Sequence, residues 1–287
     1  MFAQLPYPGV APIIDEPGFL LTAFDLLVAI AVVTGVLMSE RRAQRLGLDR
    51  RVIVDATFWA VVPGFIVSHL VSLVFYFPER LSDWRQVVNI FAGMSSLGGF
   101  IGGAAGVAYF MRRRNIPLAP YSNAIVYGFT LAWIFGRLGC TIAFDHPGVE
   151  TGFILGMEYP GGRANGLEAA VRHNLGFYEM LWACALAAFF WTQRTRPHIA
   201  GWHLTVFVAT YTPLRFLFDF LREKDLRYLG LTAAQYALIG VLVVTWLAWK
   251  RWKAIGELVE ANGEVHIFAD GRPALPLQTD GPQPETP

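Results

Sequence analysis

Two arginines stand inside long apolar segments of the chain, where a charge has to be compensated. Arg137 follows an uncharged run from Asn115 to Gly136, and Arg215 lies within the sequence YTPLRFLFDFLR at 211–222. A lipid-facing charge at membrane depth costs about 2.5–3.5 kcal/mol, so each arginine is expected to face the interior of a helix bundle and a partner there. For Arg137 taken alone, a side chain that snorkels to the outer interface is an equally good interpretation.

The spacing of Tyr211, Arg215 and Asp219 places them on one face of a helix, one turn apart. At helical rise, Arg215 lies about 24 Å from the inner start of its segment, level with Arg137 on another segment. Guanidinium groups bind phosphate oxygens in pairs of parallel hydrogen bonds. The pattern therefore predicts a phospholipid-binding site, with a structural Arg215–Asp219 ion pair and a helix-capping Arg137 as the alternative.

Other polar and small residues are expected at the same depth. Ser95 and Ser96 lie about 12 Å below the outer end of an apolar segment, and Gln235 lies four residues into the last one. Each of the paired glycines Gly98 and Gly99 weakens a helix by about 1 kcal/mol relative to alanine, which suggests bare backbone beside a ligand. Tight helix packing is the alternative for this glycine-rich run.

Composition limits the class of protein. The chain has 287 residues, of which 54% are hydrophobic and 16% charged, with a mean hydropathy of +0.42 and a net charge of +1. These values are typical of a polytopic membrane protein, and the near-neutral charge argues against nucleic acid as a partner. Cys140 and Cys184 both lie in apolar segments, so no disulfide framework, no metal site and no cofactor are predicted.

An all-α integral membrane protein with seven transmembrane helices is predicted, because seven segments are long enough to cross about 30 Å of hydrocarbon. The segments are 18–38, 54–77, 87–110, 120–143, 176–193, 199–221 and 231–250. An extracytoplasmic N-tail (1–17) without signal-peptide features precedes the membrane domain (18–252). A small periplasmic head loop (144–175), with a short helix at 166–172, is predicted between helices 4 and 5. A Pro-rich cytoplasmic tail (253–287) is predicted to be largely disordered.

Basic residues set the orientation. They follow the first, third, fifth and seventh segments, which places the N-terminus outside and the C-terminus in the cytoplasm; they are Arg41, Arg42, Arg45, Arg50, Arg51, Arg112, Arg113, Arg114, Arg194, Arg196, Lys250, Arg251 and Lys253. Arg222, Lys224 and Arg227 lie on the opposite side and go against the rule, which marks them as candidates for a function.

Several ordered motifs between about 90 and 250 resemble the prolipoprotein diacylglyceryl transferase family. GMSSLGG at 93–99 is similar to the family's GMSFHGG, GRLGCTIAFDHPG at 136–148 to GRxGNFxNxExxG, and RHNLGFYE at 172–179 to RHPSQLYE. EYPGGR at 158–163 resembles the family's PGSR-type turn, and Tyr211, Arg215 and Asp219 fall on YxxxRxxxE. The family also shows seven spans with the N-terminus outside.

The chain departs from the family pattern at several polar positions. Leu97 replaces the histidine of GMSFHGG, and Cys140 and Ala143 replace the two asparagines of the signature. Asp145 and Asp219 each replace a glutamate, and Ala23, Phe24 and Asp25 stand where the family has Trp-Tyr-Gly. Arg137, Gly139, Gly148, Tyr211 and Arg215 match the family. The phosphate-binding half of the site is thus retained, whereas the hydrogen-bonding half differs.

The resemblance implies transfer of diacylglyceryl from phosphatidylglycerol to the lipobox cysteine thiol of prolipoproteins, in the bacterial inner membrane. The predicted partners are phosphatidylglycerol, prolipoprotein signal peptides and the lipid bilayer. The predicted catalytic residues are Arg137, Arg215, Tyr211, Asp219, Asp145 and His146, with His173 as a second candidate for proton transfer. The predicted substrate-binding residues are Arg137, Gly139, Ser95, Ser96, Gly98, Gly99, Gly148 and Gln235.

In this scheme Arg137 and Arg215 hold the phosphate, Asp219 orients Arg215, and Tyr211 donates a hydrogen bond. Cysteine reacts as the thiolate and titrates near pKa 8.5, so a base or a positive field is needed, and fixed cations stabilise the departing phosphate. Two alternatives stay open: a related membrane lipid transferase with another acceptor, and a non-catalytic phospholipid-binding relative. A small-molecule transporter is less favoured, because the polar groups cluster in one leaflet.

Overall fold

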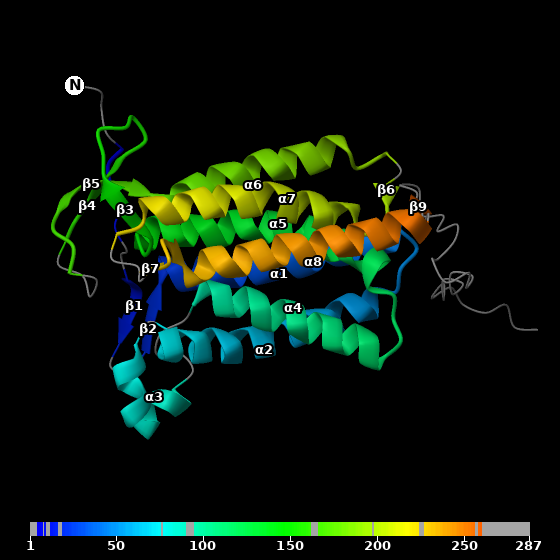
Figure 1. Cartoon of the computed structure of the whole chain (residues 1–287), viewed down its shortest axis with the longest axis horizontal. Helices are drawn as coiled ribbons and strands as arrows, with labels where there is room; N and C mark the ends of the chain where they lie inside the picture. The colour runs from blue at the N-terminus through cyan, green and yellow to red at the C-terminus, as the bar shows by residue number, and fades with distance from the viewer. Residues whose placement is uncertain are drawn as a thin grey trace, which may run out of the picture.

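The computed structural model describes most of the chain as a bundle of long helices with small β-sheets at its two ends (Figure 1). The described residues are 5–7, 9, 12–16, 19–75, 77–89, 95–161, 166–196, 198–223, 227–255 and 258–259. The predicted disorder of the tail beyond residue 259, and part of the predicted N-tail (1–4, 8, 10, 11 and 17), lie outside these residues.

The long helices run side by side in Figure 1, and neighbours in the chain are mostly antiparallel. Helix α1 packs along α5, α2 along α4, α5 along α6, and α7 against α8. The bounds are α1 Ala23–Arg45, α2 Arg50–Phe75, α4 Ser96–Arg113, α5 Leu118–Ala143, α6 Leu175–Thr192, α7 Trp202–Phe218 and α8 Ala233–Ile255, with the short helices η1 Pro78–Ser82, α3 Trp84–Val88 and η2 Asp219–Leu221.

Strands cap both ends of the bundle. At the end on the left of Figure 1, the head loop forms a three-stranded antiparallel sheet in the order β3-β5-β4, next to two hairpins. At the other end, β6 pairs with β9 in an antiparallel register, His198 opposite Val259. The bounds are β1 Pro12–Glu16, β2 Phe19–Thr22, β3 Pro147–Glu150, β4 Met157–Tyr159, β5 Ala170–Asn174, β6 His198–Ile199, β7 Arg227–Tyr228, β8 Leu231–Thr232 and β9 Leu258–Val259.

Side-chain caps fix where several helices begin. Thr22 and Asp25 form a capping box at α1, with the Asp25 carboxylate 2.9 Å from the Thr22 backbone nitrogen. Thr232 and Gln235 do the same at α8, where the Gln235 Oε1 accepts from the Thr232 N–H at 2.9 Å. Each box satisfies backbone N–H groups that have no partner inside the helix. The starts of α1 and α8, at the head end of the bundle, are therefore determined by local sequence.

Glycines let α2 and α4 touch along their length. A Cβ added at Gly102 or Gly106 would collide with the carbonyl oxygens of Pro63 and Trp59, respectively. Gly98 packs in the same way against Val67 and Ser68. The glycine-rich run therefore brings two helix backbones together, as the packing interpretation of this segment requires.

Most of the long helices have the length and composition of membrane spans. Among the described residues, six helices are long and apolar enough to cross a membrane, namely α1, α2, α5, α6, α7 with η2, and α8. The predicted segment 87–110 contains part of α3 and most of α4, which ends in Arg112 and Arg113. The structure is thus that of a mostly helical membrane protein.

Three local predictions were wrong. The segment predicted as a short helix at 166–172 contains the start of strand β5, because its residues pair with β3 and β4. The first helix begins at Ala23 instead of residue 18, since 19–22 form a strand against β1. The predicted tail boundary at 253 falls inside α8, and Leu258 and Val259 pair with β6.

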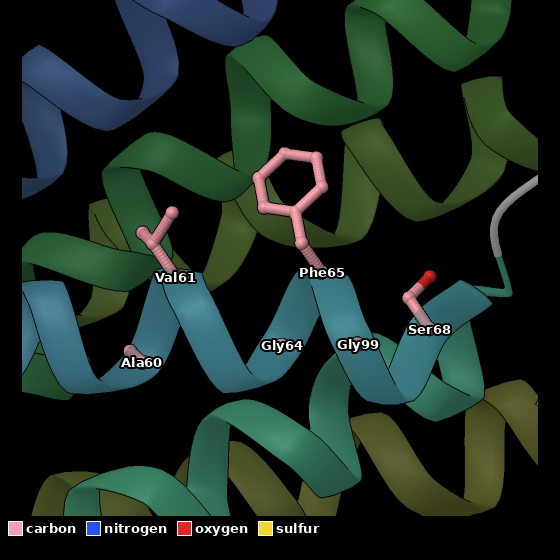
Figure 2. A pocket seen from close by; sticks show the side chains of 6 residues that line it. All are labelled: Ala60, Val61, Gly64, Phe65, Ser68 and Gly99. Carbon is pink, nitrogen blue, oxygen red and sulfur yellow. The ribbon is translucent and has the colours of Figure 1, made fainter. Parts of the chain in front are cut away.

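A shallow apolar cavity of about 230 Å³ lies on the α2–α4 pair (Figure 2). It is lined by Ala60, Val61, Gly64, Phe65, Ser68 and Gly99. Val61, Phe65 and Ser68 project from the same side of α2 in Figure 2. Among the described residues no arginine lines this cavity, whereas Gly99, one of the predicted substrate-binding residues, does.

Replacing Gly106 with alanine should destabilise the protein, because the new methyl group would overlap the Trp59 carbonyl oxygen and force α4 away from α2. Overpacking of this kind costs about 1–3 kcal/mol. Thermal unfolding of the detergent-solubilised variant should show a lowered Tm. Gly99→Ala on the same helix is the control, since its Cβ would meet nothing closer than Ser68 at 4.0 Å; an equal loss in both variants would contradict this account.

Candidate active site

One buried carboxylate joins the two arginines. The Glu179 Oε2 lies 2.9 Å from the Arg137 Nε, and its Oε1 lies 3.2 Å from the Arg215 Nη1. The Tyr211 hydroxyl donates to Glu179 Oε2 at 2.8 Å and accepts from Arg137 Nη2 at 3.4 Å. Glu179 is fully buried, and Arg137 is only 2% exposed. Helices α5, α6 and α7 thus meet at one polar centre.

A second carboxylate extends the centre to α8. The Asp219 Oδ1 lies 3.0 Å from the Arg215 Nη2, and the Asp219 Oδ2 accepts from the Thr232 hydroxyl at 2.6 Å. Arg215 is therefore held between Glu179 on one side and Asp219 on the other. Arg222, at the edge of the centre, adds a longer contact, with its Nη1 4.0 Å from the same Asp219 Oδ1. In the buried part, Arg137 and Arg215 balance Glu179 and Asp219, which is how buried ionic groups are stabilised in an apolar surrounding.

The head sheet sets the position of α6. Asn174, at the end of β5, caps α6 by accepting from the Phe177 N–H at 3.1 Å and donates to the Thr141 carbonyl at 3.0 Å. Gly176 follows, and a Cβ on it would lie 3.0 Å from the Cys140 Cβ. The small residue lets α6 approach α5 closely, and Glu179 follows within the same turn. This approach brings the carboxylate of Glu179 to Arg137.

Aromatic rings surround the ionic centre. The Arg137 guanidinium lies 4.2 Å from the Trp133 ring centroid, in a cation–π contact. The Tyr211 ring packs against Trp133, Trp182 and Phe100 with centroids 5.0–6.0 Å apart. These rings exclude water from the inner side of the centre, which strengthens its electrostatic interactions.

The chain turns back on itself directly after α5. Phe144 ends the helix in a left-handed conformation, with φ 47°, and is fully buried. Its ring packs on Tyr159 and Tyr7, so tertiary contacts hold a conformation that is rare for a side chain of this size. The turn places Asp145 and His146 beside Cys140, whose Sγ lies 3.7 Å from the Arg137 Nη1.

Asp145 and His146 form a close pair, with Asp145 Oδ1 2.5 Å from His146 Nδ1. Crowding by protein atoms favours the neutral acid, but the His146 charge and hydrogen bond, together with Arg137, hold the pKa of Asp145 below its usual value. The carboxyl group is therefore ionised at neutral pH. The side chains are 38% and 13% exposed, respectively, so this pair is the accessible edge of the polar centre.

Arg172 ties the head sheet to the end of α7. It forms ion pairs with Glu150 at 3.0 Å on β3 and with Glu223 at 2.8 Å beyond η2. Gly148 bridges Arg222 in the backbone. One of the basic residues that go against the positive-inside pattern thus lies where the head loop meets α7.

The structure brings together some of the predicted site residues. Arg137, Tyr211, Arg215 and Asp219 share the ionic centre, and Gln235 caps the adjoining α8 and donates to the Phe216 carbonyl at 3.0 Å. Gly148 lies near His173 and Leu221 in the head, and Gly139 lies against Phe24 of α1. His173 pairs with the Tyr178 hydroxyl at 2.8 Å, and partial burial lowers its pKa.

The predicted residues on α4 lie against α2 instead of the arginines. Ser95 caps α4 and exchanges backbone contacts with Ser68, whose hydroxyl donates to the Ser95 carbonyl at 2.8 Å. Gly98 and Gly99 face α2, and Ser96 is exposed. A substrate-binding role for these residues stays a prediction.

Glu179 is the residue that sequence reasoning missed. It is the last residue of the motif RHNLGFYE at 172–179. It is also the only carboxylate in the apolar segment 176–193. The same argument that singled out Arg137 applies to it, because an intramembrane carboxylate also needs a partner. Its spacing to other polar residues gave no signal, since its partners come from other helices.

These features define a multi-pass membrane protein with a buried two-arginine, two-carboxylate centre under a polar head. The chain belongs to the prolipoprotein diacylglyceryl transferase family, whose model matches residues 12–251.

Individual relatives agree with this assignment. The chain is 28% identical over 294 residues to phosphatidylglycerol–prolipoprotein diacylglyceryl transferase 2 of Streptomyces coelicolor, covering 98% of this chain and 90% of the relative. It is 27% identical over 259 residues to the enzyme of the same name from Synechococcus elongatus, covering 85% and 89%. These bacterial relatives and the apolar helices indicate a multi-pass bacterial membrane protein.

Glu179→Gln should strongly destabilise the protein, because it leaves two buried arginines facing a neutral amide. Breaking a buried ion pair from one side costs about 3–5 kcal/mol. The measurement is the Tm of the purified variant in detergent. Glu158→Gln, at the exposed middle position of β4 in the head sheet, is the matched control and should unfold like the parent protein. A Glu179→Gln variant as stable as this control would show that the centre is not held by charge.

Proposed function

We propose that the chain moves the diacylglyceryl group of phosphatidylglycerol to the cysteine thiol of a prolipoprotein lipobox. The observation that carries this proposal is the convergence of Arg137 and Arg215 on a single anionic group. A carboxylate that bridges two guanidinium groups presents one oxygen to each, and a lipid phosphate presents oxygens in the same way. Membership in the family supports the same substrates.

The centre is neutral while Glu179 and Asp219 compensate the two arginines. An entering phosphate adds negative charge to the centre. It is bound best if Arg137 and Arg215 redirect some of their N–H groups from Glu179 to the phosphate oxygens. Asp219, anchored by Thr232, keeps Arg215 in place during this exchange. Tyr211, between Arg137 and Glu179, donates a hydrogen bond to whichever anion is present.

The transfer step makes one bond and breaks one bond. The lipobox sulfur, as thiolate, forms a C–S bond to the glyceryl carbon, and the C–O bond to phosphate breaks with its electron pair on the departing glycerol phosphate. Arg137 and Arg215 stabilise the charge that develops there. The thiol proton passes to the neutral form of the His146 imidazole, which Asp145 orients at the accessible edge. The imidazolium that results keeps its hydrogen bond to the Asp145 carboxylate.

The membrane arrangement that fits this chemistry has seven spans, with α4 as the third and the N-terminus outside. The head sheet and the polar centre then face the periplasmic side of the bacterial inner membrane, where a prolipoprotein signal peptide presents its lipobox cysteine. The basic ends of α1 and α4 lie at the opposite end of the bundle from the head (Figure 1), in support of this orientation.

Complementation tests this function. Expression in bacteria depleted of their own transferase should restore growth and lipoprotein modification. Purified protein with phosphatidylglycerol vesicles and a lipobox peptide should yield the thioether product by mass spectrometry. Loss of the glycerol phosphate head group without peptide modification would indicate a transferase with another acceptor, and no head-group loss would indicate a non-catalytic lipid-binding relative.

Arg137→Gln and Arg215→Gln should each lower transfer by at least 100-fold while the protein still inserts into the membrane, because each removes a charge that stabilises the leaving phosphate. Peptide modification in phosphatidylglycerol vesicles measures the effect. Arg113→Gln is the control, since Arg113 is exposed in the last turn of α4, at the end of the helix away from the polar centre. Retained transfer in either site variant would remove the proposed mechanism.

A further inference from the structure

Cys140, Asp145 and His146 lie together at the outer end of α5. Their ligand atoms, a sulfur, a carboxylate oxygen and an imidazole nitrogen, are all within 4.8 Å of one another. Cys140 occupies a position where the family signature has asparagine, and His146 follows the acidic residue of that signature. The catalytic scheme uses Asp145 and His146 but gives no task to the thiol of Cys140.

The three donor types select one class of cation. Thiolate, imidazole and carboxylate are the ligands of Zn²⁺ and its substitutes Co²⁺ and Cd²⁺, whereas Mg²⁺ and Ca²⁺ take oxygen ligands. Metal–ligand bonds of about 2.0–2.3 Å place tetrahedral ligand atoms about 3.3–3.8 Å apart. To converge on one ion, the Asp145–His146 hydrogen bond of 2.5 Å has to open and the Cys140 sulfur has to move towards the pair, within the 4.8 Å that now spans the three ligand atoms.

The local charges also fit a divalent cation. Thiolate and carboxylate ligands together offset two positive charges, and the imidazole binds as the neutral ring. The Cys140 sulfur lies 3.7 Å from the Arg137 Nη1, so the guanidinium is the nearest fixed cation to the site. Its own charge is offset by Glu179 at 2.9 Å, which reduces its repulsion of a metal ion.

Backbone geometry holds the ligands in place. The left-handed turn at buried Phe144 brings the loop residues back onto the last helical turn that carries Cys140. The 38% exposure of Asp145 leaves a path from the outer aqueous phase, and three protein ligands leave a fourth position for water.

We propose that Cys140, Asp145 and His146 form a binding site for a Zn²⁺-class cation at the outer edge of the polar centre. The bound ion occupies the imidazole and the carboxylate that the transfer step uses, so it inhibits the reaction. The inhibition rests on the proposed function, whereas the binding does not.

Cobalt tests the binding directly. Purified protein in detergent, titrated with Co²⁺, should show a thiolate-to-cobalt charge-transfer absorption that saturates at one ion per chain. Cys140→Ser should abolish this absorption, and His146→Gln should weaken the affinity at least tenfold. Cys184→Ser, at the other free cysteine, is the matched control and should keep it. Absence of the band in the parent protein, or its survival in Cys140→Ser, would overturn the site.

An assay of peptide modification tests the proposed inhibition by the bound ion. Zn²⁺ should inhibit peptide modification by the parent protein, and a chelator should reverse the inhibition. Cys140→Asn, which restores the family residue, should lower the sensitivity to Zn²⁺ at least tenfold. Cobalt binding without Zn²⁺ inhibition would refute the inhibitory role and leave the site standing. A protein that binds cobalt but has no transfer activity would count against the proposed function alone.

Discussion

The structure depends on the contact between one buried glutamate and two buried arginines. Glu179 holds Arg137 of α5 and Arg215 of α7 through its two oxygens, so three helices cannot shift relative to one another without exposing a charge to lipid. Buried ion pairs contribute little net stability over apolar packing, but removal of one member is costly. The centre therefore specifies one arrangement of helices, and the arrangement in turn keeps the two guanidinium groups directed at one point.

Much of the site follows from sequence because its residues repeat at helical spacing. Tyr211, Arg215 and Asp219 were expected on one face, and Arg215 and Asp219 form an ion pair 3.0 Å long. Counting the helical rise along the two segments predicted that Arg137 and Arg215 lie at the same depth. In the structure Glu179 joins the two arginines. Glu179 itself was not predicted as a site residue, since its partners lie 42 and 36 positions away along the chain and one sequence contains no information on such pairings.

The glycines of α4 show that one sequence pattern can have two different structural causes. A glycine can allow either a ligand or a second helix to approach the backbone closely. Both causes produce the same residues in the sequence. At Gly102 and Gly106 the neighbour is α2. The head loop was likewise misread locally, because short strands such as β5 are stabilised by pairing with β3 and β4 and not by the propensity of their own residues.

The order of the charges along the chain bears on how the protein enters the bilayer. Arg137 and Glu179 belong to α5 and α6, which are consecutive and form an antiparallel hairpin. Arg215 on α7 and Asp219 at its C-cap lie one turn apart. During synthesis, the first hairpin can compensate its own arginine before α7 emerges, and α7 arrives with its carboxylate already paired. Each unit that leaves the translocon is thus neutral as a whole, so the nascent chain acquires a four-charge interior without exposing an isolated ion to acyl chains.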